Sequence, residues 1–240
     1  MTNSGTIFFS DWDGTITLQD SNDYLTENIG FGRPKRLEIN DRILDGSMLF
    51  RDGFQAMLDL VTTPMPECID LLLANVDLDP GFPEFYKWAT LKNIPVVVVL
   101  SGMTPIIKAL LTKLVGPEAV DNIEILSNDV KIEEDGLWDI VYKDDSDFGH
   151  DKSKSIREYL ARHKVDTNST LMFYAGDGVS DISAAKETNL LFAKQGKDLI
   201  TYAKREGIPY TTFTNYSDIL SKTKAIVNAG GANIKEFLEN

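Results

Sequence analysis

The stretch TIFFSDWDGT, residues 6–15, indicates how the whole chain folds. Residues 6–10 form a short, β-prone apolar run that is typical of a buried strand, and the run ends abruptly at Asp11. In open α/β sheets the reactive groups gather beyond the carboxyl ends of the strands. The pattern therefore predicts a first strand that delivers two carboxylates, Asp11 and Asp13, to one edge of a sheet.

Other runs along the chain are also typical of strands. Residues 95–100 include four consecutive valines, which suits a strand buried on both faces of a parallel sheet. The other candidate strands are residues 171–175, 190–193 and 210–213. Helical patterns lie between them, at residues 105–116, 152–164 and 180–188. This alternation predicts an α/β fold with a mainly parallel, Rossmann-like sheet and helices on both faces.

Residues 18–80 are far too long for an ordinary strand-to-helix connection of about 2–6 residues. Apolar side chains recur at helical spacing over residues 50–61, and Pro66 opens a second such pattern. We therefore expect a small helical cap domain inserted above the first strand. The catalytic core is then residues 1–17 and 81–240, with a short β-hairpin formed by residues 130–133 and 137–142 around the Asp135-Gly136 turn.

Polar residues follow each of the clearest candidate strands. Ser101-Gly102 follows the valine-rich run, and Gly176-Asp177-Gly178 follows residues 171–175, with Asp181 four residues after Asp177. Together with the first motif these bring four carboxylates to one edge, where they repel each other unless a cation separates them or one takes up a proton. Such an oxygen-rich site is the kind that Mg²⁺ prefers.

Each motif taken singly also has a structural explanation. Asp177 and Asp181 alone suit a helix cap and its first turn, and Lys152 alone suits an exposed lysine at a helix start. D-x-D-G occurs in turns and calcium loops, although an EF-hand requires glycine at the sixth loop position and Gly14 would be the fourth. The motifs occurring together, each behind an apolar strand, favour catalysis.

The combined pattern resembles the haloacid dehalogenase superfamily of aspartate-nucleophile phosphatases, whose four motifs match residues 11–15, 101, 152 and 176–181. The insertion after the first motif resembles the phosphoserine-phosphatase-like branch. Within it the chain is similar over nearly its whole length to fungal cytosolic phosphatases of sugar alcohol phosphates. The stretches that carry this likeness are residues 20–26 (DSNDYLT), 78–82 (LDPGF), 101–116, 148–156 and 176–194.

The resemblance implies a role for each carboxylate. Asp11 would attack phosphorus, and Asp13 would act as general acid on the leaving alkoxide and then as general base on water. Mg²⁺ would be held by the side chains of Asp11 and Asp177 and the main-chain carbonyl of Asp13, with Asp181 in support.

The resemblance also implies that Ser101, Gly102 and Lys152 bind the phosphoryl oxygens. Lys154 is the rival for the lysine role. Lys152 is preferred because Ile156, four residues later, matches the apolar position that follows this lysine in the family.

The insertion departs from the phosphoserine phosphatases, which bind the substrate carboxylate with a cap arginine. Gln55 stands at that place here, and Asp20 stands where they carry a glutamate. Without the arginine a carboxylate loses its bidentate partner, which favours a neutral, polyhydroxylated leaving group. The arginines that remain as substitutes are Arg33, Arg42 and Arg51.

Three polar residues after the first motif have two interpretations. Asp20, Asn22 and Asp23 are candidates to bond substrate hydroxyls from the insertion side. They equally suit a helix N-terminus, with Asp20 or Ser21 as the cap and Asp23 in the first turn.

Composition restricts the partners. The 240 residues carry a net charge of −13, which argues against binding to nucleic acid or to anionic lipid surfaces. The single cysteine, the absence of a signal-peptide pattern in residues 1–10 and the short apolar runs favour a cytoplasmic protein. We expect a monomer or weak homodimer.

These observations predict a Mg²⁺-dependent phosphomonoesterase for small soluble esters, with polyol or sugar phosphates as its substrates and an aspartyl-phosphate intermediate. The alternatives are a phosphoserine-type phosphatase, a phosphatase for the enol-phosphate of methionine salvage, and a phospho-acceptor or sensor module. The sensor would form a long-lived aspartyl-phosphate, whereas Asp13 and the long insertion favour turnover.

Overall fold

The computed structural model describes residues 5–239. Residues 1–4 and 240 of the expected core therefore lie outside the described part, as do the first four of the residues 1–10 that were searched for a signal peptide. The described residues form one seven-stranded sheet in the order β4-β3-β2-β1-β5-β6-β7. All neighbouring strands are parallel except β3 and β4. The strands are β1 (Thr6–Ser10), β2 (Val96–Met103), β3 (Glu124–Ile132), β4 (Trp138–Val141), β5 (Leu171–Gly176), β6 (Leu190–Lys194) and β7 (Tyr210–Phe213).

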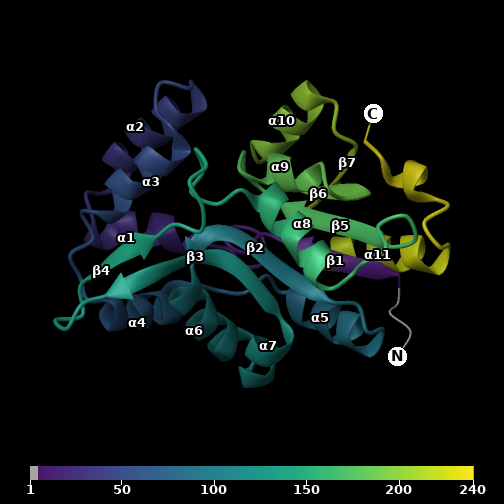
Figure 1. Ribbon diagram of the computed structural model, residues 1–240, viewed down its shortest axis with the longest axis horizontal. Helices are drawn as coiled ribbons and strands as arrows, with labels where there is room; N and C mark the ends of the chain where they lie inside the picture. Colours follow the sequence, from purple (N-terminus) through teal and green to yellow (C-terminus); the bar gives the residue numbers. More distant parts are fainter. Residues whose placement is uncertain (1–4, 240) are drawn as a thin grey trace.

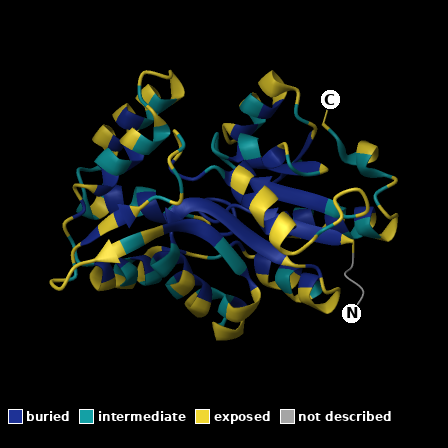
Figure 2. Ribbon diagram, viewed as in Figure 1, coloured by how far each residue is buried: buried dark blue, intermediate teal, exposed yellow. Residues whose placement is uncertain are grey.

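Helices cover both faces of this sheet, as Figure 1 shows. Side chains alternate along each strand, so Phe8 of β1 packs into one core and Phe9 into the other. The first core is closed by α4 (Met65–Asn75), α5 (Phe82–Leu91), α6 (Thr104–Leu114), α7 (Pro117–Asn122) and α11 (Tyr216–Asn228). The second is closed by α8 (Lys152–Arg162), α9 (Asp181–Ala185) and α10 (Leu199–Glu206). The expected α/β fold class is confirmed, and Figure 2 shows the strands as the buried layer.

The expected hairpin forms, and its first strand is longer than residues 130–133 and also belongs to the main sheet. Its first strand starts at Glu124 and pairs in parallel with β2 before its second half pairs antiparallel with β4. Residues 124–129 escaped prediction because they mix charged and apolar side chains along a half-exposed strand. The pairing of Met103 with Asn128 also carries β2 three residues beyond the predicted end at residue 100.

The long stretch after β1 is helical. It contains α1 (Ser21–Ile29), α2 (Arg33–Leu44), α3 (Phe50–Leu58) and α4. Figure 1 shows α1, α2 and α3 beyond the carboxyl ends of the central strands, whereas α4 lies beside α6 under the sheet. The division into a core and an insertion of residues 18–80 stays a prediction.

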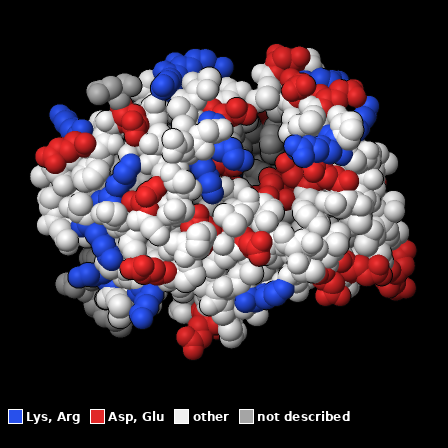
Figure 3. Space-filling view, turned by 180° about the vertical axis from the view of Figure 1, so that it is seen from behind, with Lys and Arg blue, Asp and Glu red and all other residues white. Residues whose placement is uncertain are grey.

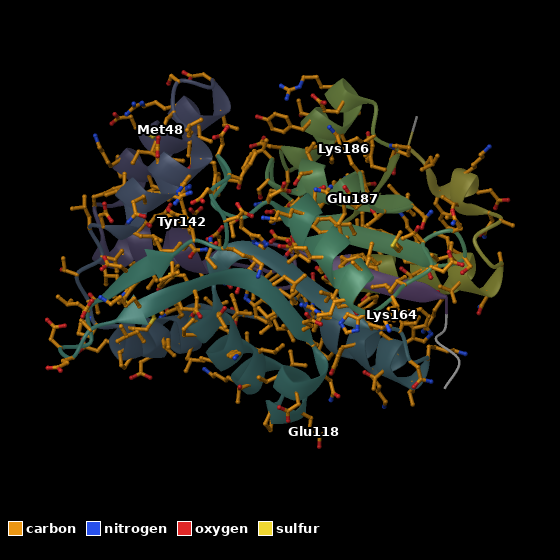
Figure 4. All side chains as sticks on the ribbon, in the orientation of Figure 1. Met48, Glu118, Tyr142, Lys164, Lys186 and Glu187 are labelled. Atoms are coloured by element: carbon orange, nitrogen blue, oxygen red, sulfur yellow. The ribbon has the colours of Figure 1, made fainter. Side chains whose placement is uncertain are left out.

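The β3–β4 hairpin and the segment after it fasten this helical stretch to the sheet. The indole Nε1 of Trp138 donates to the carbonyl of Thr63 at 3.1 Å, and the Tyr142 hydroxyl donates to the carbonyl of Arg51 at 3.1 Å. The Arg51 guanidinium lies 4.5 Å from the centre of the Tyr142 ring. Figure 4 places Tyr142 between the helices and the hairpin. These contacts hold α3 over the strand ends. The remaining regular element is a 3₁₀ helix at Ile234–Phe237.

Candidate active site

Asp11 leaves β1 at the carboxyl edge of the sheet. Its amide still donates to the carbonyl of Ala175 at 2.8 Å, so the residue is held in strand register. The chain then folds back on itself, because the carbonyl of Trp12 accepts from the amides of Thr15, Ile16 and Thr17. This turn places both Asp11 and Asp13, which are 8% and 7% exposed, on the wall of one cavity.

Gly14 makes this turn possible. Its φ is +70°, and a Cβ atom there would lie 2.5 Å from Oδ2 of Asp177. A side chain at this position would therefore push Asp177 out of place as well as straining the backbone.

We expect Gly14→Ala to lower the free energy of unfolding by about 1–2 kcal/mol and to reduce the phosphomonoesterase activity expected from the sequence by about tenfold or more. Gly207→Ala is the matched control, because Gly207 also has a positive φ (+64°) but a Cβ atom there would meet no heavy atom within 4 Å. Urea unfolding and turnover of both variants check this. Equal activity in the two variants would contradict the role of the close approach to Asp177.

Lys152 lies between two of the carboxylates. Its Nζ is 3.0 Å from Oδ1 of Asp11 and 2.6 Å from Oδ1 of Asp181, and the side chain is 1% exposed. Burial disfavours the charged ammonium, but the attraction of Asp11 and Asp181 outweighs that cost and raises the pKa of Lys152. Lys154 is exposed, and only its backbone amide takes part locally, donating to the helix cap Asp151. Of the two candidates, Lys152 rather than Lys154 is thus the lysine that contacts Asp11 at the strand ends.

Asp181 is completely buried and is held by four donors. Its Oδ2 accepts from the amides of Asp177 and Gly178, both at 3.0 Å. Its Oδ1 accepts from Lys152 and from the Tyr174 hydroxyl, which is also 2.6 Å away. Tyr174 was not predicted from the sequence, because a tyrosine within an apolar strand resembles an ordinary core residue. The one signal in the sequence that could have indicated its role is its position two residues before Gly176-Asp177.

The side chain of Asp13 points away from this group, toward α1. Its Oδ1 accepts from the amide of Ser21 at 2.8 Å, and its Oδ2 accepts from Nδ2 of Asn22 at 3.0 Å. Burial and the nearby charge of Asp20 raise the pKa of Asp13 to about 8, although the bonds from Ser21 oppose the shift. A carboxyl group with that pKa carries a proton near neutral pH.

Ser101 and Gly102 follow the valine-rich part of β2 at the same edge. The carbonyl of Ser101 accepts from Nδ2 of Asn128 at 2.7 Å, which fixes the backbone here. The Ser101 hydroxyl is buried and no partner within residues 5–239 bonds to it. An unpaired buried hydroxyl that lines a cavity is ready to bond a ligand.

One cavity of about 230 Å³ lies between the strand ends and the helices α1, α2 and α3. The strand-end groups that line it are Asp11, Asp13, Ser101, Gly102, Lys152 and Asp177, whereas Asp181 lies behind them. Figure 3 shows the surface hollowed there. The wall opposite the strand ends is partly apolar, and its members include Ile43, Phe50, Phe54 and Met57. Asp20, Asn22 and Asp23 supply its polar part.

Comparison with known proteins identifies the family. The model of haloacid dehalogenase-like hydrolases matches residues 8–186. The chain belongs to this family. It is 50% identical over 238 residues to polyol phosphate phosphatase PYP1 of Saccharomyces cerevisiae, covering 98% of each chain. It is 51% identical over 211 residues to Pdp3-interacting factor 1 of Schizosaccharomyces pombe, covering 88% of this chain and 91% of that protein.

More distant relatives extend the likeness. A 2-hydroxy-3-keto-5-methylthiopentenyl-1-phosphate phosphatase of Bacillus cereus is 27% identical over 220 residues, covering 91% of this chain and 96% of that enzyme. A substrate-bound phosphoserine phosphatase structure shares the fold with a TM-score of 0.65 and 15% identity, over 82% of this chain and 89% of that one. The chain is thus a phosphatase of the haloacid dehalogenase-like family, and the non-enzymatic sensor is set aside.

Phosphatases of this family generally use Mg²⁺, and the donors here suit that ion. Carboxylate oxygens of Asp11, Asp177 and Asp181 lie within 4.8 Å of one another. Burial raises the pKa of Asp11 well above its usual range and that of Asp177 to about 6, and the charge of Asp181 adds to both shifts. A bound cation would relieve this repulsion. Lys197 partly does so already, with Nζ 3.2 Å from Oδ2 of Asp177.

The expected residues of the insertion divide into two groups. Asp20 and Asp23 line the cavity, and Asp20 is also the cap of α1, accepting from the amide of Asp23 at 2.8 Å. Gln55 does not line the cavity: it donates to Asp59 at 2.5 Å along α3. The helix turns Phe54 toward the cavity, and the next residue is rotated by about 100° away from that face.

His150 is a buried residue between β2 and α8 that supports the site of this haloacid dehalogenase-like phosphatase. The residue is 1% exposed, and its ring bonds on both sides, with Nδ1 2.7 Å from the carbonyl of Leu100 and Nε2 2.7 Å from the Ser155 hydroxyl. It thereby ties the end of β2 to α8, which carries Lys152. Burial disfavours the charged ring and lowers the pKa of His150 to about 4.

This shift predicts a loss of stability in mild acid. The unfolded chain protonates this ring near pH 6.5 and the folded protein only near pH 4, so the unfolded state binds more protons as the pH falls between these values. Relative to His150→Gln, the wild type should lose about 2 kcal/mol of unfolding free energy between about pH 7.5 and about pH 5. The difference between the two proteins isolates His150 from the buried carboxyl groups, which act in the opposite direction. Urea unfolding of both proteins at each pH measures this difference. A difference in unfolding free energy between wild type and His150→Gln that is the same at both pH values would refute the prediction.

Proposed function

We propose that this chain is a Mg²⁺-dependent phosphomonoesterase that hydrolyses small polyol or sugar phosphates through an aspartyl-phosphate on Asp11. The observation that carries the proposal is the contact of buried Lys152 with both Asp11 and Asp181 at the end of the cavity. A fixed cation beside a carboxylate nucleophile is what transfer of a phosphoryl dianion requires.

In the first step an Oδ atom of Asp11 attacks phosphorus, and the bond from phosphorus to the ester oxygen breaks. Asp13 gives its proton to that oxygen, so the leaving group departs as a neutral alcohol. The raised pKa of Asp13, about 8, supports this because the group is protonated before the step.

In the second step the ionised Asp13 takes a proton from water, and the water oxygen attacks phosphorus. The bond between phosphorus and Asp11 breaks, which releases inorganic phosphate and restores the Asp11 carboxylate. The Ser101 hydroxyl, the Gly102 amide and the Lys152 ammonium bind the phosphoryl oxygens in both steps.

Asp11 and Asp177 would hold the magnesium ion through their side chains, together with the main-chain carbonyl of Asp13. The ion supplies Lewis-acid stabilisation of the phosphoryl charge when it is bound. Asp181 takes a supporting part, because its oxygens already accept from Lys152, Tyr174 and two backbone amides. It positions Lys152 and the loop that carries Asp177.

The walls of the cavity favour an uncharged leaving group. Among the described residues that line it, Lys152 is the one cation, and it lies at the phosphoryl end. Arg33, Arg42 and Arg51 do not line it; Arg51 instead bonds the carbonyl of Asp144. A phosphoserine carboxylate would meet Asp20 and Asp23, and the nearby cations Arg36 and Lys197 are already paired, with Asp23 and Glu27 and with Asp177. Hydroxyl groups would find acceptors there. The name of the Saccharomyces relative supports the same substrate class.

A second candidate substrate is an enol-phosphate with an apolar tail. The apolar wall formed by Phe50, Phe54 and Met57 suits a methylthio group, and the Bacillus relative is named for such a substrate. Asp20 and Asp23, in the polar part of the same wall, favour the polyol.

We also propose that the protein works in the cytoplasm, as a monomer or weak homodimer, without nucleic-acid or membrane partners. The net charge of −13 supports the last point. No helix in residues 5–239 is both long and apolar enough to cross a membrane.

Phosphate release from a panel of esters tests the proposal. We expect glycerol and sugar alcohol phosphates to be hydrolysed with Mg²⁺ and turnover to fall by at least about a hundredfold when the metal is chelated. Phosphoserine should be a poor substrate, and the enol-phosphate measures the second candidate. Undiminished turnover after chelation, with restored Mg²⁺ having no effect, would refute the metal dependence.

A further inference from the structure

Asn22 lies at the junction between the general acid and the cavity. It is in the first turn of α1, its side chain lines the cavity, and the residue is 9% exposed. Its Nδ2 donates to Oδ2 of Asp13 at 3.0 Å. Its other amide atom, Oδ1, is buried and has no hydrogen-bond partner within the described part of the chain.

An unpaired buried acceptor is uncommon in a native protein, because the oxygen has lost water and gained nothing in return. The cost is recovered when a donor enters the cavity. The main-chain carbonyl of Asn22 already accepts a hydrogen bond from the Thr26 hydroxyl at 2.9 Å. The acceptor of Asn22 that lacks a donor is therefore its side-chain oxygen, Oδ1.

Space beside this amide is kept free by Gly102. A Cβ atom at Gly102 would lie 3.2 Å from Nδ2 of Asn22 and 3.2 Å from Oδ2 of Asp13. A larger residue would therefore crowd both groups. With glycine there, a ligand bound to Ser101 and Lys152 can extend past Asp13 to Asn22, since all of these residues line the same cavity.

We propose that Oδ1 of Asn22 accepts a hydrogen bond from the substrate hydroxyl on the carbon next to the ester carbon. The inference rests on the proposed function, in which Asp13 protonates the ester oxygen. Because the Asn22 amide and Asp13 are in direct contact, two substrate oxygens that bond to them must be close to each other. Oxygens on adjacent carbons satisfy that condition, so the site selects vicinal hydroxy phosphates.

The neighbouring acids are less suited to this role. Oδ1 of Asp20 accepts from the amide of Asp23, and Oδ2 of Asp23 is paired with Arg36 at 2.9 Å. The Asn22 oxygen has no such competitor. A neutral amide also adds no negative charge beside a phosphate ester, whereas a carboxylate there would repel it.

Two esters that differ by one hydroxyl test the proposal. Glycerol 3-phosphate carries the vicinal hydroxyl, and propane-1,3-diol monophosphate lacks it but keeps the terminal one. With Mg²⁺ present, we expect the wild type to prefer glycerol 3-phosphate by about tenfold or more in kcat/KM. In Asn22→Leu the kcat/KM for both esters should fall, because Asp13 loses a hydrogen-bond donor. The preference for glycerol 3-phosphate should shrink to about twofold or less, because Oδ1 is gone. Asn22→Ala removes the same acceptor with less bulk and repeats the test if the leucine variant does not fold.

Two further variants separate recognition from positioning. Asn22→Asp keeps an acceptor at this place, so it should retain the preference while losing overall activity. Asn28→Leu changes an exposed asparagine on the same helix and should leave both substrates unaffected. A preference that survives in Asn22→Leu and Asn22→Ala, or a wild type that cleaves both esters equally well, overturns the inference alone. A wild type that cleaves neither ester nor para-nitrophenyl phosphate overturns the proposed function with it.

Discussion

Replacing Asp11 by asparagine is expected to lower kcat by at least about 10⁴-fold. The amide has nearly the same shape as the carboxylate, but its nitrogen is not a nucleophile toward phosphorus and it leaves Lys152 with one fewer anionic partner. The fold should survive, because Asp181 still pairs with Lys152 and the backbone bond from Asp11 to Ala175 does not involve the side chain. Turnover of a small phosphate ester with saturating Mg²⁺ measures the effect.

Asp70→Asn is the matched control for this substitution. Asp70 is exposed on α4 and does not line the cavity, so its loss should leave kcat unchanged. Retention of more than about a tenth of the wild-type rate in Asp11→Asn would mean that the nucleophile lies elsewhere.

Replacing Lys152 by methionine is expected to lower kcat/KM by about 10²–10³-fold, because the phosphoryl group loses its fixed cation. The same change leaves Asp11 and Asp181 buried beside each other without their shared partner. We therefore expect the free energy of unfolding to fall by about 3 kcal/mol in the absence of Mg²⁺, with a smaller loss when the metal is present.

Lys154→Met provides the comparison, since it removes the same charge two residues away on the exposed side of α8. It should change neither turnover nor stability by a measurable amount. Should Lys154→Met prove the more damaging of the two, the assignment of the motif lysine would have to be reversed.

Much of the fold was predictable because its strands are buried on both faces. The bounds predicted for β1 and β7 match the structure, and β5 and β6 each extend one residue further. The first part of β2, and most of β5 and β6, are apolar runs, which a sequence reveals directly. The half-exposed β3 carries no such run, and its pairing with β2 depends on contacts between segments distant in the chain.

The position of α4 illustrates the same limit. Periodicity predicted a helix after Pro66, but not that it would lie beside α6 under the sheet rather than above the strand ends. Cys68 and Leu72 of this helix are buried in the main core. An amphipathic pattern states that a helix has an apolar face, and it does not state which surface that face covers.

The candidate site was predictable where the chain itself fixes the geometry. Asp11 and Asp13 follow one strand, and a single turn keeps them together. Tyr174 and Asn22 gain their importance only from tertiary contacts, with Asp181 and with Asp13. Gln55 illustrates the reverse case: a residue placed by sequence register alone turned out to lie off the cavity wall.

Acid-quenched enzyme, analysed by peptide mass spectrometry during steady-state turnover with Mg²⁺, tests the central claim most directly. We predict a phosphoryl group on the peptide that contains Asp11, sensitive to hydroxylamine as an acyl phosphate is, and absent from Asp11→Asn. A phosphoryl group on another residue, or full turnover through Asp11→Asn, would contradict the account.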